Sequence, residues 1–211
     1  MLQQYNRGVF INAPFDHTHW DLFHAMVFTV LDCGFDPRCA LETDDGSQVR
    51  IEKLFGIIEE CRLGIHDISY TALDPTTGFP RFNMPLELGI FLAAKRFGSA
   101  RQRRKNCLVL DGEPYRYQKF ISDIAGQDIR SHDREPRQAV QLVRNWLRNA
   151  ERGAAKPAVI SSEDVIWSRY ESFRSNLEPF SRSLGLRGDN LIFNDFIYVA
   201  AAYLREFAAQ K

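Results

Sequence analysis

Short apolar segments alternate with amphipathic ones along the first 150 residues, and this order constrains the fold more than any other feature of the chain. The apolar runs have the length of buried strands, and the segments between them repeat apolar residues at helical spacing. The expected strands are residues 8–12, 35–41, 63–68, 106–111 and 128–131, and the expected helices are residues 20–33, 49–61, 83–97, 115–121 and 136–149. This alternation predicts an α/β domain with a mostly parallel sheet and right-handed connections.

A change of pattern near residue 150 indicates where this domain ends. Residues 152–157 combine glycine, alanine and proline in the manner of a linker. Beyond them, two helices are expected over residues 162–184 and 190–209. We therefore predict a flavodoxin-like open parallel sheet with helices on both faces over residues 1–150, and a C-terminal helical appendage over residues 158–211.

Charge and hydropathy narrow the set of partners. Lysine plus arginine equal aspartate plus glutamate at 27 each, so no overall field attracts nucleic acid or an anionic membrane. The one dense basic run, residues 101–105, is interpreted as a solvated loop, with a nucleic-acid or acidic-partner contact as the alternative. The N-terminus lacks a signal-peptide pattern, and the apolar run of residues 196–204 is too short for a bilayer. We expect a cytoplasmic protein without a membrane or nucleic-acid partner.

Cysteine and histidine spacing does not indicate a bound metal. The four cysteines lie far apart in apolar segments, as reduced core thiols do. They are Cys33, Cys39, Cys61 and Cys107. His17, His19 and His24 lie close in sequence but lack a matched set of acidic or cysteine ligands. The chain also has no glycine-rich phosphate loop and no GxSxG nucleophile elbow, so we expect neither a metal nor a cofactor.

Two acidic residues fall where an open α/β sheet binds ligands. Asp67 ends the third expected strand, and Glu87 lies near the start of the next helix. Strand ends and helix starts share one edge of such a sheet, so the two carboxylates can face a common crevice suited to a sugar or nucleotide. Asn83 fits the N-cap and lies on the same side of the helix as Glu87. The helix dipole favours an ionised Glu87, which can attack or stabilise a cationic sugar carbon.

Each of these acidic residues also has a plainer explanation. Glu87 can simply complement the helix dipole, and Asp67 can cap the following loop through an Asx turn. The residues alone leave both alternatives open.

The order of the acidic residues is shared with a known group of proteins. Asp67-Ile68-Ser69, a loop, and then Asn83-x-Pro85-x-Glu87-Leu88-Gly89 resemble the nucleoside 2-deoxyribosyltransferase-like group and its TIR-like nucleotide-binding relatives. Residues 10–16 resemble the substrate-lining first loop of these families, and the resemblance covers residues 8–147. The long segment of residues 70–81 departs from the pattern and could act as a lid.

The resemblance implies a site and an activity. In those families a glutamate in the helix after the third strand acts on an N-glycosidic bond, which implies a catalytic role for Glu87 and a supporting role for Asp67. We expect cleavage or transfer on a nucleoside, nucleotide or NAD-like substrate. The expected substrate-binding residues are Asn12, Asp16, Ser69 and Asn83.

The alternative to an enzyme is a non-catalytic nucleotide-sensing or TIR-like interaction module. The expected C-terminal helices carry more apolar residues than one narrow stripe needs, so they either pack on the domain or form a homo-oligomer. The resemblance further implies a role in bacterial defence against phage.

Overall fold

Five parallel strands form the central sheet of the computed structural model, which describes residues 2–71, 78–151 and 159–209. The strands are β1 (Gly8–Asn12), β2 (Asp36–Arg38), β3 (Leu63–Asp67), β4 (Asn106–Asp111) and β5 (Ile129–Ser131). Their order is β2-β1-β3-β4-β5, and every neighbouring pair is parallel. The predicted open α/β sheet is confirmed. Its strand order reverses between β1 and β3, the place where open sheets bind ligands.

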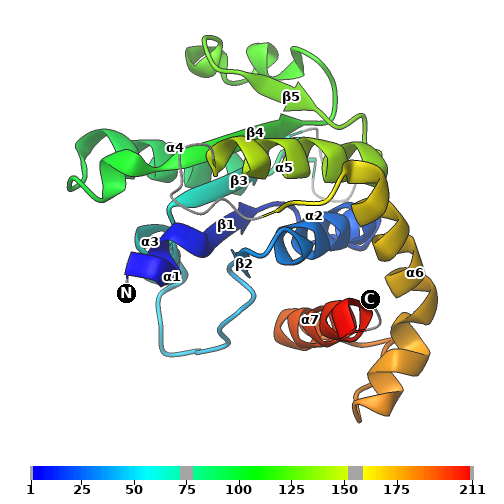
Figure 1. The fold of residues 1–211 in the computed structure, drawn as a ribbon. Coiled ribbons are helices and arrows are strands. Elements are labelled where there is room, and N and C mark those ends of the chain that lie inside the picture. The colour runs from blue at the N-terminus through cyan, green and yellow to red at the C-terminus, as the bar shows by residue number, and fades with distance from the viewer. Residues whose placement is uncertain (1, 72–77, 152–158, 210–211) are drawn as a thin grey trace.

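Helices cover both faces of this sheet (Figure 1). α2 (Trp20–Asp32) and α5 (Pro136–Ala150) pack on one face, and α3 (Arg50–Glu60) and α4 (Asn83–Phe97) pack on the other. A short N-terminal helix, α1 (Leu2–Arg7), precedes β1 and was not predicted from the sequence. The described connections contain 3-10 helices at His17–His19, Gln102–Arg104, Arg116–Lys119 and Ser122–Ile124.

Strand alternation determines which layer each side chain enters. Ile65 belongs to the cluster under α2 and α5, whereas the rings of Phe10 and Phe91 meet His66 on the α3/α4 face, with centroids 5.8 and 4.9 Å from the imidazole. Gly64 permits the close approach of α4, since an added Cβ there would lie 2.8 Å from the Phe91 ring. Successive residues of β3 therefore face opposite layers up to the end of the strand.

The C-terminal helices, α6 (Glu163–Ser183) and α7 (Phe193–Ala209), share the main hydrophobic core. The ring of Phe173 on α6 stacks on Phe28 of α2 at 5.1 Å and meets Phe196 of α7 at 5.7 Å. Figure 1 shows α7 beside α2, with α6 running past both. The linker predicted at residues 152–157 lies outside the described residues.

The basic run at residues 101–105 is only partly the solvated loop that its charge suggested. Its three arginines are exposed, but Lys105 is 2% exposed and donates to the carbonyls of Ile58 and Cys61 at the end of α3. Desolvation by burial lowers the pKa of Lys105 to about 8. Lys105 therefore caps the C-terminal end of α3 through two backbone carbonyls, one of which, that of Ile58, also accepts the Cys61 N–H. Among the described residues, no helix is long and apolar enough to cross a membrane.

Replacing Tyr170 by phenylalanine should measure how firmly α6 is docked. The buried Tyr170 hydroxyl donates to the backbone oxygen of Asp21 at 3.1 Å, so its loss should lower the free energy of unfolding by about 1 kcal/mol in urea titrations. Tyr203→Phe, which removes an exposed hydroxyl contact with Ser172, is the matched control and should cost less than about 0.5 kcal/mol. A Tyr170→Phe variant as stable as wild type would contradict this docking.

Candidate functional site

Glu87 is a buried carboxyl near the N-terminal end of α4. It is 7% exposed, and it has no hydrogen bond or ion pair with any described residue. Desolvation by burial raises the pKa of Glu87 to about 7, and the nearby Arg50 only partly opposes this effect. The expectation that the helix dipole keeps Glu87 ionised is therefore wrong. Burial outweighs the dipole and shifts the equilibrium of the carboxyl toward its protonated form.

The surroundings of Glu87 lie on the α3/α4 face of the sheet. Arg50 begins α3, and the charge of Glu87 adds to the effect of burial that raises the pKa of the Cys39 thiol, just after β2. Asn12 connects the end of β1 to α4, since its Nδ2 donates to the Met84 oxygen at 2.8 Å and lies 3.1 Å from His66 Nδ1. Asn12 thus holds the first turn of α4 in place beneath Glu87.

The first loop is joined to the segment before α4 by an ion pair. Arg81 donates to Asp16 at 2.6 Å, and its guanidinium lies 5.4 Å from the centroid of the Tyr70 ring. Asn83 is exposed and is not the N-cap, which is Phe82. The expected capping role of Asn83 is wrong because α4 begins at Asn83 itself, and the N-cap residue, Phe82, forms no side-chain capping hydrogen bond. The substrate-binding roles of Asp16 and Asn83 remain predictions.

Asp67 is enclosed in a hydrogen-bonded cluster on the opposite, α2/α5 face. It is 0% exposed, and its Oδ2 accepts from His19 Nε2 at 2.7 Å. Its Oδ1 accepts from the Ser69 backbone N–H at 2.9 Å and lies 3.4 Å from His132 Nε2. Burial pushes the pKa of Asp67 up, but the neighbouring imidazoles of His132 and His19 outweigh it and hold the pKa well below its usual range. Asp67 is therefore ionised, with both oxygens engaged.

The contact between Asp67 and the Ser69 backbone is an Asx turn, so this plainer explanation of Asp67 is confirmed. Asp67 and Glu87 share the carboxyl edge of the sheet but lie on opposite faces of β3. Within the described parts of the chain, no hydrogen bond or ion pair joins them. The catalytic roles of both residues and the substrate-binding roles of Asn12 and Ser69 remain predictions.

His132 is the member of this cluster that sequence reasoning missed. It lies just after β5, far along the chain from His19 and Asp67, and no local pattern links the three residues. The ring nitrogens of the two histidines and an oxygen of Asp67 lie within 4.8 Å of one another, as metal ligands do. His132 Nδ1 accepts the Arg134 backbone N–H at 3.0 Å, which places the ring proton on Nε2, facing Asp67. Because Nε2 carries the proton in this tautomer, it can donate toward Asp67 but cannot ligate a metal ion.

No protein-family model and no curated protein matches the chain. The structure therefore establishes an α/β fold with a five-stranded parallel sheet, and assignment to a family remains a proposal.

The raised pKa of Glu87 predicts a pH-dependent stability. Between the ordinary value of 4.5 and about 7, folded Glu87 holds a proton that the unfolded chain has released, so the free energy of unfolding falls as the pH rises. Glu87→Gln should remove this loss, which amounts to about 3 kcal/mol above pH 7. Urea unfolding of the wild type and the variant from pH 4 to 8 measures this loss of stability. Parallel stability profiles for wild type and variant would contradict the raised pKa.

Proposed function

We propose that the protein cleaves or transfers across the N-glycosidic bond of a nucleoside, nucleotide or NAD-like molecule, with Glu87 as the reacting carboxyl. One observation carries the proposal. Glu87 is a buried carboxyl without a hydrogen-bond partner among the described residues, and it lies at the carboxyl edge of the sheet beside the reversal of strand order.

The chemistry follows from desolvation. As the bond between a sugar and its base breaks, the anomeric carbon gains positive charge and the electron pair stays on the base nitrogen. A purine or pyrimidine then takes up a proton, whereas the cationic nicotinamide ring of a NAD-like molecule becomes neutral without one. A carboxylate that burial has made less stable gains most from a cation that develops beside it. If a Glu87 oxygen then bonds to the carbon, attack by water completes hydrolysis and attack by a second base completes transfer.

Other residues near Glu87 fit supporting roles. Asn12 holds the Met84 carbonyl in the first turn of α4 and so positions the helix that carries Glu87. Arg50 supplies a positive charge that favours the ionised, reactive form of Glu87. Both residues act on the carboxyl through its position or its charge.

A nucleotide-sensing module without chemistry is the second candidate. It is favoured by the contact between Asp67 and His19, which is the N-cap residue of α2. α2 in turn packs against α6 and α7, so a ligand that displaced His19 would act on the helix that supports the C-terminal pair. In this account Glu87 binds the ligand without reacting.

Chromatography of the free base tests the proposed function. The wild-type protein is incubated with NAD, nucleosides, deoxynucleosides and their monophosphates, with and without a second base as acceptor. Release of a base from one member supports the proposal, and exchange of bases identifies transfer. If no member releases a base while one binds saturably, the enzymatic proposal fails and the sensing module replaces it.

A further inference from the structure

A cavity of about 410 Å³ opens on the α2/α5 face of the carboxyl edge, across β3 from the environment of Glu87. Its walls come from three separate parts of the chain: the start of α2, the turn after β3 and the segment that leads into α5. The lining residues that matter here are His19, Asp21, Ser69, Arg134 and Pro136. Of these residues, only Ser69 was expected from the sequence to bind substrate.

Two helix N-termini border the cavity. His19 is the N-cap of α2, which has 13 residues, and Pro136 begins α5, which has 15. Neither N-cap residue forms a side-chain capping hydrogen bond, and the Trp20 N–H at the start of α2 already donates to the His17 oxygen of the preceding 3-10 helix. The first turn of α5 is therefore the clearer source of unpaired N–H groups. The partial positive charge of such helix ends favours an anionic ligand.

Ser69 supplies an independent sign of a ligand. Its side chain lines the cavity, is 3% exposed, and has a hydroxyl without a partner in the part of the chain that the structure describes. A buried hydroxyl without a hydrogen bond is costly, and a bound acceptor would remove that cost. An added Cβ at Gly112 would lie 3.4 Å from Ser69 Cβ and 3.5 Å from Arg134 Nε, so both side chains lie beside Gly112.

Arg134 places a positively charged side chain at the cavity, beside Ser69. Its guanidinium forms no hydrogen bond or ion pair with the described residues, although its backbone N–H donates to His132 Nδ1. Asp133 and Arg134 have φ values of 52° and 61°, in the left-handed region that residues other than glycine seldom adopt. Strain of this kind is found where a chain holds side chains for function.

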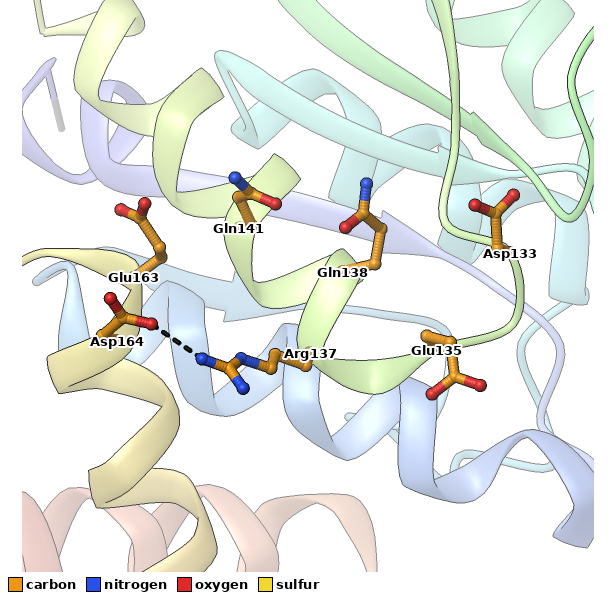
Figure 2. Close-up of a pocket in the computed structure, with 7 residues that line it drawn as sticks. All are labelled: Asp133, Glu135, Arg137, Gln138, Gln141, Glu163 and Asp164. Atoms are coloured by element: carbon orange, nitrogen blue, oxygen red, sulfur yellow. Dashed lines mark hydrogen bonds and ion pairs between the residues drawn. The ribbon is translucent and has the colours of Figure 1, made fainter.

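The charges that line this cavity differ from those that line a neighbouring hollow. Asp21 also lines the cavity, but its carboxylate is largely exposed and is paired with Arg174 at 3.1 Å. The neighbouring hollow, of about 400 Å³, is acidic, as Figure 2 shows. Its acidic side chains are Asp133, Glu135, Glu163 and Asp164, and Arg137, which also lines it, is paired with Asp164 at 2.8 Å. An anion is therefore expected in the first cavity and not in the second.

We propose that the cavity beside Ser69 and Arg134 binds the phosphate group of a small-molecule ligand. The Arg134 guanidinium donates to two phosphate oxygens, the Ser69 hydroxyl donates to a third, and the open helix ends add their N–H groups. Asp67 and His132 are positioning residues, because they fix the His19 ring and the backbone of Arg134. One consequence rests on the proposed function: a substrate that reaches this cavity is a nucleotide and not a free nucleoside.

Calorimetric titration with inorganic phosphate tests this inference without any assay of activity. We expect saturable binding to wild type and at least about tenfold weaker binding to Arg134→Gln, since a charge-assisted pair is lost. Ser69→Ala should weaken binding severalfold. Arg137→Gln is the matched control, because it removes another exposed arginine a few residues away, in the acidic hollow, and it should bind phosphate like wild type.

Three results would overturn the inference: no saturable binding of phosphate, wild-type affinity in Arg134→Gln, or equal weakening in Arg134→Gln and Arg137→Gln. Glu87→Gln should leave phosphate affinity unchanged. Failure of this site and failure of the proposed reaction are therefore distinguishable, since one is read from phosphate binding and the other from release of a base.

Discussion

Replacing Glu87 by glutamine should reduce release of the base by about 100-fold or more while leaving ligand affinity within a few fold of wild type. The amide matches the carboxyl in size, so the buried site keeps its shape, but it can neither carry the negative charge nor form the glycosyl ester. The loss should appear in kcat, because the missing interaction develops only as the glycosidic bond breaks. Steady-state chromatography of the free base measures it.

Glu113→Gln is the matched control for this variant. Glu113 follows β4 at the same edge of the sheet, but its side chain is exposed. The control should keep wild-type rates. A Glu87→Gln variant with wild-type turnover would remove Glu87 from the chemistry.

Asp67→Ala should lower the free energy of unfolding by about 3–5 kcal/mol. The ionised carboxylate accepts from His19 and from the Ser69 backbone and lies beside His132, all in a fully buried environment. Removing the carboxylate leaves these donors without an acceptor, which destabilises the folded state. The variant no longer has to bury a charge, but this gain offsets only part of that cost. Urea unfolding at pH 7 measures the difference.

Asp123→Ala, at an exposed position in a 3-10 helix, should stay within about 0.5 kcal/mol of wild type. Because the pKa of folded Asp67 is held below its usual value of 3.8, its contribution is present above that pH and is lost on further acidification. The stability difference between Asp67→Ala and wild type should therefore narrow in strong acid. A cost below about 1 kcal/mol at pH 7 would show that Asp67 is not bound as the structure places it.

Strands and helices with strong patterns were predictable from the sequence almost to the residue. The bounds of β1, β4 and α4 agree with the expected residues 8–12, 106–111 and 83–97. The edge strand β2 was expected over residues 35–41 but pairs only over Asp36–Arg38. An apolar run indicates which residues are buried, but it does not indicate how many of them pair with the neighbouring strand. α1 was missed because six residues are too few to show a helical period.

The site was less predictable because it depends on contacts between distant parts of the chain. The strand and helix patterns brought Asp67 and Glu87 to one edge, but they could not show that the two residues lie on opposite faces of β3. His132 meets Asp67 only because β5 packs beside β4, and its short strand has no pattern that points to the cluster. The raised pKa of Glu87 likewise depends on burial beneath neighbouring side chains, whereas the sequence showed only its place near a helix start.

Titration of the Glu87 side-chain carboxyl by carbon-13 NMR tests the central claim of this account most directly. The signal is assigned by its absence in Glu87→Gln and followed from pH 4 to 9. A midpoint near 7 is expected, because burial without a hydrogen-bond partner among the described residues disfavours the charged form. A midpoint near the ordinary value of 4.5 would show a solvated or paired carboxyl, and would contradict the observation on which the proposed glycosidic chemistry rests.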